Sequence, residues 1–455
     1  MNRRVVLLVA ILASFVAFLD GSVVNVALPA IARELGGGLA LQQWVVDAYL
    51  VTLGALILLA GSLSDLFSRT RVLLIGLIGF GVASVLCALA PTAGVLIAAR
   101  ALQGVAGALL VPSSLALIIS AFDGEEQSKA IGRWTAWTSV AMLIGPFLGG
   151  IFVDTLSWRW VFAVNVAPIV VTCVLLGRLP SAPGRPGARV DVPGAVLGAL
   201  GLGGVVFALI EQGQRGWTDA VVLGSAAIGV AAGIAFFLVE RRVARPMLPL
   251  SIFRAHDFSI GNLATTAIYA ALSLGPLMVG LYLQQVAGLP ASLAGLALIP
   301  STIVTLLLAS RFGALAGRIG ARRFMTVGPL VVAAGFLWML LIRSPFDYWW
   351  QVLPGVVLMG IGVSLTVAPL TAAILGSIAP AEAGIASAIN NAVSRVAGLV
   401  AVACAGLVVG QRLDLAGLDR ILIVEAVLLV IGAAISGFGI RDEFLHTAAT
   451  APPRR

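Results

Sequence analysis

Fourteen long apolar runs follow one another along this chain, and they limit its possible folds more than any other feature. A helix needs about 20 apolar residues to cross the hydrocarbon core of a bilayer. Strands of a membrane barrel alternate between apolar and polar residues over about ten positions, and these runs do not alternate. The sequence therefore predicts an all-α integral membrane protein. The expected spans lie near residues 5–28, 42–63, 72–90, 94–120, 130–153, 159–178, 191–210, 219–239, 257–284, 291–311, 322–342, 348–375, 384–410 and 420–440.

The composition excludes a water-soluble protein of this size. Of the 455 residues, 60% are hydrophobic and only 11% are charged, whereas a soluble domain carries about 25% charged residues. The net charge of +8 does not indicate nucleic-acid binding, because the basic residues form short clusters between apolar runs rather than a face. Cys87, Cys173 and Cys404 lie inside apolar runs without the spacing of a disulfide framework or a zinc site.

The positions of the arginines predict the orientation of the chain in the membrane. If the N-terminus lies in the cytoplasm and the spans alternate, most Lys and Arg residues fall in cytoplasmic segments, as the positive-inside rule requires. An even number of spans keeps both termini on that side, so fourteen spans fit better than thirteen. A cleaved signal peptide after Arg3 and Arg4 is the alternative for the first run, but the run continues through Asp20 to Pro29 without an obvious cleavage site.

Two halves of six spans can be laid over each other. The cytoplasmic loop after the second span is Gly61–Arg71 in the first half and Gly313–Arg323 in the second. A glycine-rich run leads to Pro112 in one fourth span and to Pro369 in the other. Duplicated six-span halves are the usual architecture of a secondary transporter. The expected organisation is an N-terminal half at 1–179, a two-span insertion with Arg/Pro-rich linkers at 180–256, a C-terminal half at 257–441 and a cytoplasmic tail at 442–455.

Four motifs occur in order at defined spans. The first span carries Leu19-Asp-Gly-Ser-Val-Val-Asn-Val-Ala-Leu-Pro29, and the loop after the second span reads Gly61-Ser-Leu-Ser-Asp65-Leu-Phe-Ser-Arg69-Thr-Arg71. The fourth span contains Arg100-Ala-Leu-Gln103-Gly104, and the fifth contains Gly145-Pro146-Phe-Leu-Gly149-Gly150. Taken together, these motifs resemble those of the major facilitator superfamily, and within it the fourteen-span drug:proton antiporters of the EmrB/QacA type.

The chain departs from that family at several positions. Ser22 stands where threonine is common, and Ala141 where an earlier glycine of the fifth-span motif is expected. The loop motif loses family residues at Leu66, Ser68 and Thr70. The resemblance implies a proton-coupled exporter that works by alternating access, without a cofactor or a metal. We expect a monomer in the inner membrane of a bacterial cell, with protons, a small-molecule substrate and lipid as its partners.

Five charged residues lie well inside the spans: Asp20, Asp47, Arg100, Arg395 and Glu425. A charge at membrane depth is expensive, so each is a functional-site hypothesis. At about 1.5 Å per residue, Asp20, Asp47 and Arg100 all come out roughly 8 to 12 Å below the outer surface. A carboxyl in a poorly hydrated cavity can be neutral or charged depending on its access to water. We therefore predict proton coupling at this level.

The role of each buried charge has an alternative. Asp20 is predicted to carry the proton, with Arg100 holding it ionised; the resemblance implies the same roles, and the alternative is a static ion pair that locks two spans. Asp47 is either a second proton or cation site or a cap near the start of the second span. For Arg395 and Glu425 we favour a structural pair between neighbouring spans.

The motif residues are expected to control conformation. A proline in mid-helix bends the fifth span, and glycines let neighbouring helices approach closely. In the loop, Asp65 can accept from the nearby arginines and latch one state, or the loop can be a tight turn with arginines that set topology. The expected conformational residues are Gly61, Asp65, Arg69, Arg71, Gln103, Gly104, Gly145, Pro146, Gly149 and Gly150.

A substrate cavity is expected to use buried amides and aromatic rings. Aromatic rings bind flat or cationic molecules, but for each ring we favour packing in the core or at the membrane interface over a place in the cavity. Amides are better candidates because burying them unsatisfied is costly. The candidates are Asn25, Tyr49, Gln103, Trp134, Trp137, Asn262, Tyr269, Tyr282, Gln284, Gln285, Asn390 and Asn391.

No catalytic set is recognisable in the sequence. Ser/His/Asp groupings and lysine-containing phosphate loops are missing, so neither an enzyme nor nucleotide-driven transport is expected. The leading hypothesis is a proton-driven exporter of hydrophobic or amphipathic drugs. A dedicated exporter of one endogenous antibiotic or lipid is the rival within transport, because a fold does not fix a substrate. A membrane enzyme or signalling protein is a remote alternative.

Overall fold

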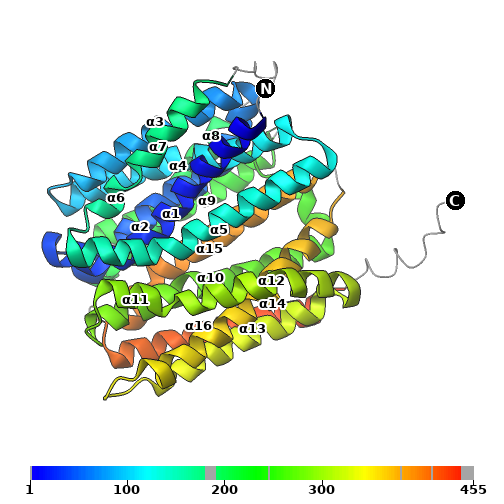
Figure 1. The fold of residues 1–455 in the computed structure, drawn as a ribbon. Helices are drawn as coiled ribbons and strands as arrows, with labels where there is room; N and C mark the ends of the chain where they lie inside the picture. The colour runs from blue at the N-terminus through cyan, green and yellow to red at the C-terminus, as the bar shows by residue number, and fades with distance from the viewer. Residues whose placement is uncertain (1–2, 180–190, 244–245, 380–381, 411–412, 442–455) are drawn as a thin grey trace. The chain divides into compact units, whose positions relative to one another are not determined.

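The computed structural model describes residues 3–179, 191–243, 246–379, 382–410 and 413–441 (Figure 1). Every regular element within those ranges is helical, so the all-α prediction is confirmed for the described chain. The chain divides into two compact units. The first unit contains Met1–Met247 and Leu283–Leu296, and the second contains Leu248–Tyr282 and Ala297–Arg455.

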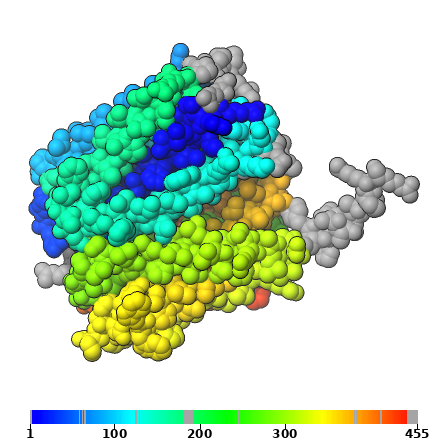
Figure 2. Space-filling view, viewed as in Figure 1, coloured from blue at the N-terminus to red at the C-terminus, as the bar shows by residue number. Residues whose placement is uncertain are grey.

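In the first unit, α1 lies along α5 and α2 lies along α4, and Figure 2 shows α1 in dark blue against α5 in cyan. The two helices between the halves, α8 and α9, pack against each other, and α8 also contacts α2. The elements are α1 (Arg3–Leu35), α2 (Gly38–Leu66), α3 (Arg69–Ala88), α4 (Ala93–Ala121), α5 (Gly124–Thr155), α6 (Trp160–Ala163), α7 (Val166–Leu176), α8 (Val192–Arg215), α9 (Ala220–Glu240) and most of α11 (Ala291–Ala297).

In the second unit, α14 packs against both α12 and α13, and α13 also contacts α16. The elements are η1 (Leu250–Arg254), most of α10 (His256–Gln285), α12 (Ile299–Ile319), α13 (Ala321–Trp338), η2 (Met339–Leu341), η3 (Tyr348–Val352), α14 (Leu353–Gly376), α15 (Ala383–Val409) and α16 (Leu415–Gly439).

Thirteen helices of the described chain are long and apolar enough to cross a membrane. They correspond to thirteen of the expected runs. The run expected at 159–178 is instead a shorter pair, α6 and α7, which together cover Trp160–Leu176. The pair is separated at Val164 and Asn165. The expected second span of the C-terminal half is formed by α11 and α12 together.

Large apolar side chains are exposed on the outer helices. On α3, Ile75 is 64% exposed and Val82 is 56% exposed, and on α9 Ile228 is 60% exposed. Soluble proteins rarely expose contiguous apolar patches larger than a few hundred Å². Helices of this length with such surfaces are suited to lipid, so the chain is a multi-pass membrane protein.

The contact between α1 and α5 depends on glycines. A Cβ built at Gly145 would lie 1.9 Å from Ser22 Oγ and 3.2 Å from the Val23 backbone nitrogen. A Cβ at Gly149 would lie 2.7 Å from the Val23 carbonyl oxygen. Two helix backbones can approach this closely only where side chains are absent, so the glycines set the distance between α1 and α5.

Gly145→Ala is therefore expected to lower the melting temperature of the purified protein. Overpacking of this kind costs about 1 to 3 kcal/mol. Gly132→Ala in the same helix is the matched control, because a Cβ at Gly132 meets nothing within 4 Å and alanine favours a helix over glycine. Melting curves in detergent measure both variants, and equal melting temperatures would contradict the close packing at Gly145.

Candidate functional site

Asp20 and Arg100 form an ion pair at the centre of the first unit. Arg100 Nη1 lies 2.7 Å from Asp20 Oδ2, and the two side chains are 2% and 0% exposed. Asp20 comes from the middle of α1 and Arg100 from the first two turns of α4. The structure thus brings together the two charges that the sequence placed at one membrane depth.

Two amides complete the hydrogen bonding of the Asp20 carboxylate. Gln103 Nε2 donates to Asp20 Oδ1 at 2.9 Å, and Asn165 Nδ2 donates to the same oxygen at 2.8 Å. Gln103 also donates to Ser84 Oγ at 2.9 Å. Gln103, Asn165 and Ser84 are all 0% exposed. Three donors thus engage both oxygens of the Asp20 carboxylate.

The guanidinium of Arg100 is held on its other sides as well. Its Nε donates to the Val45 carbonyl of α2 at 2.9 Å, and its Nη1 also donates to Gln103 Oε1 at 2.6 Å. The Tyr49 ring lies against it, with the Arg100 Cζ 4.3 Å from the ring centroid. The planar fork of arginine can make these contacts together, whereas lysine offers only a point charge.

Gly104 explains how α2 comes close enough to reach Arg100. A Cβ at Gly104 would lie 2.2 Å from the Tyr49 carbonyl oxygen and 2.1 Å from Thr52 Oγ1. Thr52 Oγ1 donates to the Ala101 carbonyl of α4 at 2.8 Å, which fixes the same helix pair. The Arg-x-x-Gln-Gly motif therefore supplies the cation, an amide and the close approach within two turns of α4.

Ser84 and Asn165 were not among the sequence-based candidates. Each is a single polar residue in an apolar run, and a serine or asparagine in such a run has many structural explanations. Asn165 lies at the start of α7, where the sixth predicted span is interrupted. A buried amide at an interrupted span is the signal that could have pointed to it.

Asp47 is separate from this hydrogen-bonded group. It lies in α2 between Val45 and Tyr49 and is 0% exposed. Among the residues that the structure describes, neither of its carboxyl oxygens has a hydrogen-bond partner. Asp20, by contrast, accepts hydrogen bonds from three side chains. A buried charge without partners is very costly at membrane depth.

The fifth-span motif contacts two elements of the first unit. Gly145 and Gly149 face α1, whereas a Cβ at Gly150 would lie 2.3 Å from the Cα of Ser292 in α11. Pro146 lies inside α5. Four residues beyond Gly150, the Asp154 carboxylate accepts from the backbone nitrogen atoms of Ala291 and Ser292 at 3.0 and 2.8 Å.

The loop motif is described only in part. The structure does not describe the side chain of Asp65, and at Gly61 it describes only the helical backbone. The predicted latch therefore lies outside the described residues. Arg69 Nη1 donates to the Ala116 carbonyl near the end of α4 at 3.1 Å. Arg71 is exposed.

The second unit contains its own group of amides, in which Asn262 is buried and Asn390 is half-buried. Asn390 Nδ2 donates to Asn262 Oδ1 at 3.2 Å and to Thr265 Oγ1 at 2.9 Å. Asn262 Nδ2 donates to the Phe258 carbonyl at 2.8 Å. These bonds join α10 to α15, so Asn262 and Asn390 lie together as candidates for one polar surface.

The predicted pair between Arg395 and Glu425 is wrong. Arg395 Nε donates to Asn391 Oδ1 at 3.1 Å, one helical turn away on α15. Both oxygens of Glu425 lack a hydrogen-bond partner within the described chain. Adjacent spans and similar depth do not determine which face of a helix a residue occupies, and these two side chains do not meet.

The remaining cavity candidates differ in exposure. Trp134 Nε1 donates to Ser14 Oγ at 2.9 Å, and Tyr282 is buried. Trp137 and Gln285 are exposed, whereas Asn25, Tyr269, Gln284 and Asn391 are half-buried.

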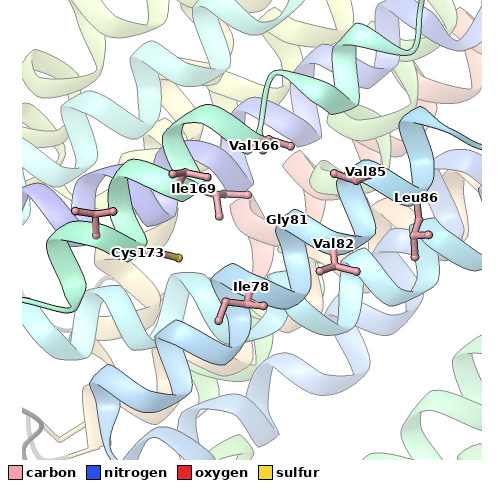
Figure 3. Close-up of a pocket in the computed structure, with 10 residues that line it drawn as sticks. Ile78, Gly81, Val82, Val85, Leu86, Val166, Ile169 and Cys173 are labelled. Atoms are coloured by element: carbon pink, nitrogen blue, oxygen red, sulfur yellow. The ribbon is translucent and has the colours of Figure 1, made fainter.

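An apolar groove of about 460 Å³ lies between α3 and α7 (Figure 3). Aliphatic side chains such as Ile78, Val82 and Ile169 line it together with Cys173. None of the predicted cavity residues lines this groove. Specific ligand sites combine apolar walls with a few placed polar groups, so the groove is suited to lipid chains rather than to a selected substrate. Among the described residues, no group of three His, Cys, Asp or Glu side chains could hold a metal ion.

The chain has close relatives among characterised bacterial proteins. It is 36% identical over 411 residues to the puromycin resistance protein pur8 of Streptomyces alboniger, and the match covers 87% of this chain and 80% of that protein. It is 35% identical over 421 residues to the multidrug resistance protein Stp of Mycobacterium tuberculosis, with 91% and 78% covered.

The fold is also that of solved transporters. A peptide transporter, POT, crystallised with sulfate, superposes with a TM-score of 0.70 at 16% identity, and 95% of this chain and 94% of that chain are covered. The Major Facilitator Superfamily profile matches residues 10–402. This match covers most of the chain and agrees with the helical fold that it shares with solved transporters. The chain therefore belongs to the Major Facilitator Superfamily.

Proposed function

We propose that the chain is a proton-coupled exporter that expels hydrophobic or amphipathic drugs from a bacterial cell by alternating access. The relatives named for puromycin and multidrug resistance support the export of antibiotics. The Asp20 group, a fully buried carboxylate held by Arg100, Gln103 and Asn165, is the single observation that carries proton coupling.

The Asp20 group links protonation to helix contacts. In the described conformation Asp20 joins α1 to α4 and to the start of α7, and in the proposed cycle this is the ionised state. When water brings a proton to Asp20, the carboxyl becomes neutral and its attraction to Arg100 is lost. The helices that meet there are then free to separate. Release of the proton on the cytoplasmic side restores the pair and completes the cycle.

The motif residues support the conformational change. The glycines of α4 and α5 allow helix backbones to slide at close range, and Pro146 gives α5 a bend. We infer that helices move against each other at the close contacts made by four glycines: Gly104, Gly145, Gly149 and Gly150. In the loop, Asp65 with Arg69 or Arg71 is proposed to latch one state from the cytoplasmic side, together with Gly61.

The substrate is proposed to contact buried and half-buried amide side chains. Asn262 and Asn390 are the strongest candidates because they already form a polar group in the second unit. Asn25, Trp137, Tyr269, Gln284, Gln285 and Asn391 remain candidates as well. Tyr49 is proposed to act through Arg100, because its ring covers the guanidinium.

We infer a fourteen-span topology of the EmrB/QacA type, with α6 and α7 together forming the sixth span and with both termini in the cytoplasm. The arginine distribution of the sequence supports this orientation. We propose a monomer, because both halves of the transport unit lie in one chain.

Green fluorescent protein fused to the C-terminus is expected to fluoresce in intact cells, since it folds in the cytoplasm. A dark fusion that is correctly inserted contradicts fourteen spans.

A dedicated exporter of one antibiotic is the second candidate. The name of the puromycin resistance relative supports it, whereas the name of the multidrug relative supports a broad range. A susceptibility panel in a bacterial host without its own efflux pumps distinguishes them. Resistance to several unrelated amphipathic drugs is expected for the broad exporter, and resistance to one compound indicates the dedicated one.

Asp20→Asn is expected to abolish drug efflux driven by a pH gradient and to return host resistance to the level of the empty vector. The amide keeps the shape of the side chain but cannot carry a proton or pair as an anion with Arg100. Efflux of a drug that the wild type expels, measured in everted vesicles with an imposed pH gradient, provides the readout.

The matched control for this variant is Asp123→Asn. Asp123 is an exposed carboxyl at the start of α5 and makes no side-chain capping bond, so the same chemical change there should leave efflux intact. Both variants are compared at equal amounts of inserted protein. Undiminished pH-driven efflux by Asp20→Asn would remove Asp20 from the mechanism.

A further inference from the structure

Glu425 is a buried acid for which the proposed cycle has no role. It lies ten residues into α16 and is 0% exposed. Neither of its carboxyl oxygens has a hydrogen-bond partner in the part of the chain that the structure describes. An ionised carboxylate without counter-ion or donors is extremely costly in such surroundings. In this conformation Glu425 is therefore a neutral, protonated acid.

The space for this acid is made by Gly275 of α10. A Cβ at Gly275 would lie 2.4 Å from Glu425 Oε2 and 2.3 Å from Phe336 Cζ. The next residue is Pro276, inside α10. A proline has no N–H for the carbonyl four residues earlier and disturbs the helix locally. The carboxyl of Glu425 thus lies against a part of α10 where Gly275 has no side chain and Pro276 has no backbone N–H.

The two sequence halves place their acids differently. Asn165, at the start of the second part of the last span of the first half, reaches Asp20 of the first span. Glu425, in the last span of the second half, lies close to Gly275 in the first span of that half. In the second half the carboxyl is supplied by the last span instead of the first.

Among the described residues, no cation bonds to Glu425 as Arg100 bonds to Asp20. Gly360 corresponds to Gly104, because both glycines lie against the second span of their own half. A Cβ added at either position would collide with that span. Counting back from Gly360, Val356 and Met359 take the places of the arginine and glutamine that hold Asp20. These side chains are 0% and 3% exposed. At these sequence positions, apolar residues thus replace the donors of the first half.

Within the described chain, no charged or titratable group on the elements around α16, Cys404 of α15 included, hydrogen-bonds to Glu425. On α15, Arg395 bonds to Asn391. On α13, Arg322 Nε donates to the Gly437 carbonyl, and Arg323 is its neighbour in sequence at the same end. The η2 turn carries no charge. The remaining groups on α10 and on α16 itself are His256, Asp257, Tyr269, Tyr282, Asp419 and Arg420. None of these groups donates to the Glu425 oxygens within the described chain.

We propose that Glu425 is a second proton-binding site, so that each transport cycle exchanges one more proton than Asp20 carries alone. This inference rests on the proposed antiport. The proton binds to a carboxylate oxygen of Glu425 when that side chain is open to external water, and the apolar pocket then holds the neutral acid. When the pocket becomes hydrated on the cytoplasmic side, the O–H bond breaks, water takes the proton, and the carboxylate is regenerated.

Infrared difference spectroscopy tests the protonation directly and needs no substrate. In the purified wild-type protein in proteoliposomes, we expect a carbonyl band of a protonated carboxyl that is lost in Glu425→Gln. The band should decrease reversibly as the pH is raised. Identical spectra for wild type and variant overturn the proposal, and so does a band that no pH between 5 and about 10 affects, because such an acid is never discharged.

Glu425→Gln should fold, since the amide resembles the neutral acid in shape, and a melting curve checks this. Glu425→Met provides a second apolar replacement if the amide is not tolerated. The matched control is Asp419→Asn on the same helix, whose half-buried carboxylate pairs with Arg343 at 3.4 Å. That variant should keep the infrared band.

Proton stoichiometry tests the role in transport. Proteoliposomes with a fixed gradient of one pH unit accumulate puromycin or ethidium, whichever the wild type carries, to a steady ratio. Each coupled proton contributes about tenfold to that ratio per pH unit, so Glu425→Gln should lower it about tenfold and Asp419→Asn should not. An unchanged ratio in Glu425→Gln refutes the second proton alone, whereas wild-type liposomes without pH-driven accumulation refute the antiport itself.

Discussion

An ionised pair inside an apolar helix bundle needs hydrogen-bonding partners for its charged atoms. The Asp20 and Arg100 pair has partners from α2, α4 and the start of α7, and Ser84 of α3 accepts a hydrogen bond from one of them, Gln103. Burying two charges rarely adds net stability, since desolvation offsets most of their attraction. The proposed role of the two buried charges is therefore a switch rather than a source of stability. The contacts of the pair change with the charge on Asp20, and the surrounding helices supply those contacts.

Small residues make this arrangement possible. Gly104 brings α2 to the guanidinium of Arg100, and Gly145 brings α1, which carries Asp20, against α5. Each close contact would be blocked by a single methyl group, so the distances between spans and the hydrogen bonds at the pair depend on one another. A change in the charge of one carboxyl can thus be transmitted to helix packing without any large side chain moving far.

The sequence was sufficient for thirteen of the fourteen expected spans and for one contact of the site. Apolar runs of membrane length identified thirteen long helices, and equal depth predicted that Asp20 would meet Arg100. Ser84 and Asn165 were missed because one polar residue in an apolar run does not reveal which way it points. The predicted pair of Arg395 with Glu425 failed for the same reason: depth follows from counting residues, but the face of a helix depends on how its neighbours pack.

The most direct measurement of the central claim compares two transport modes of the same Asp20→Asn protein in proteoliposomes. One mode is accumulation of drug driven by a pH gradient, and the other is exchange of labelled for unlabelled drug at equal pH. If protonation of Asp20 couples the proton to the cycle, the variant loses the first mode and keeps the second, because the carrier can still reorient with drug bound. Retention of both modes would contradict proton coupling through the buried pair.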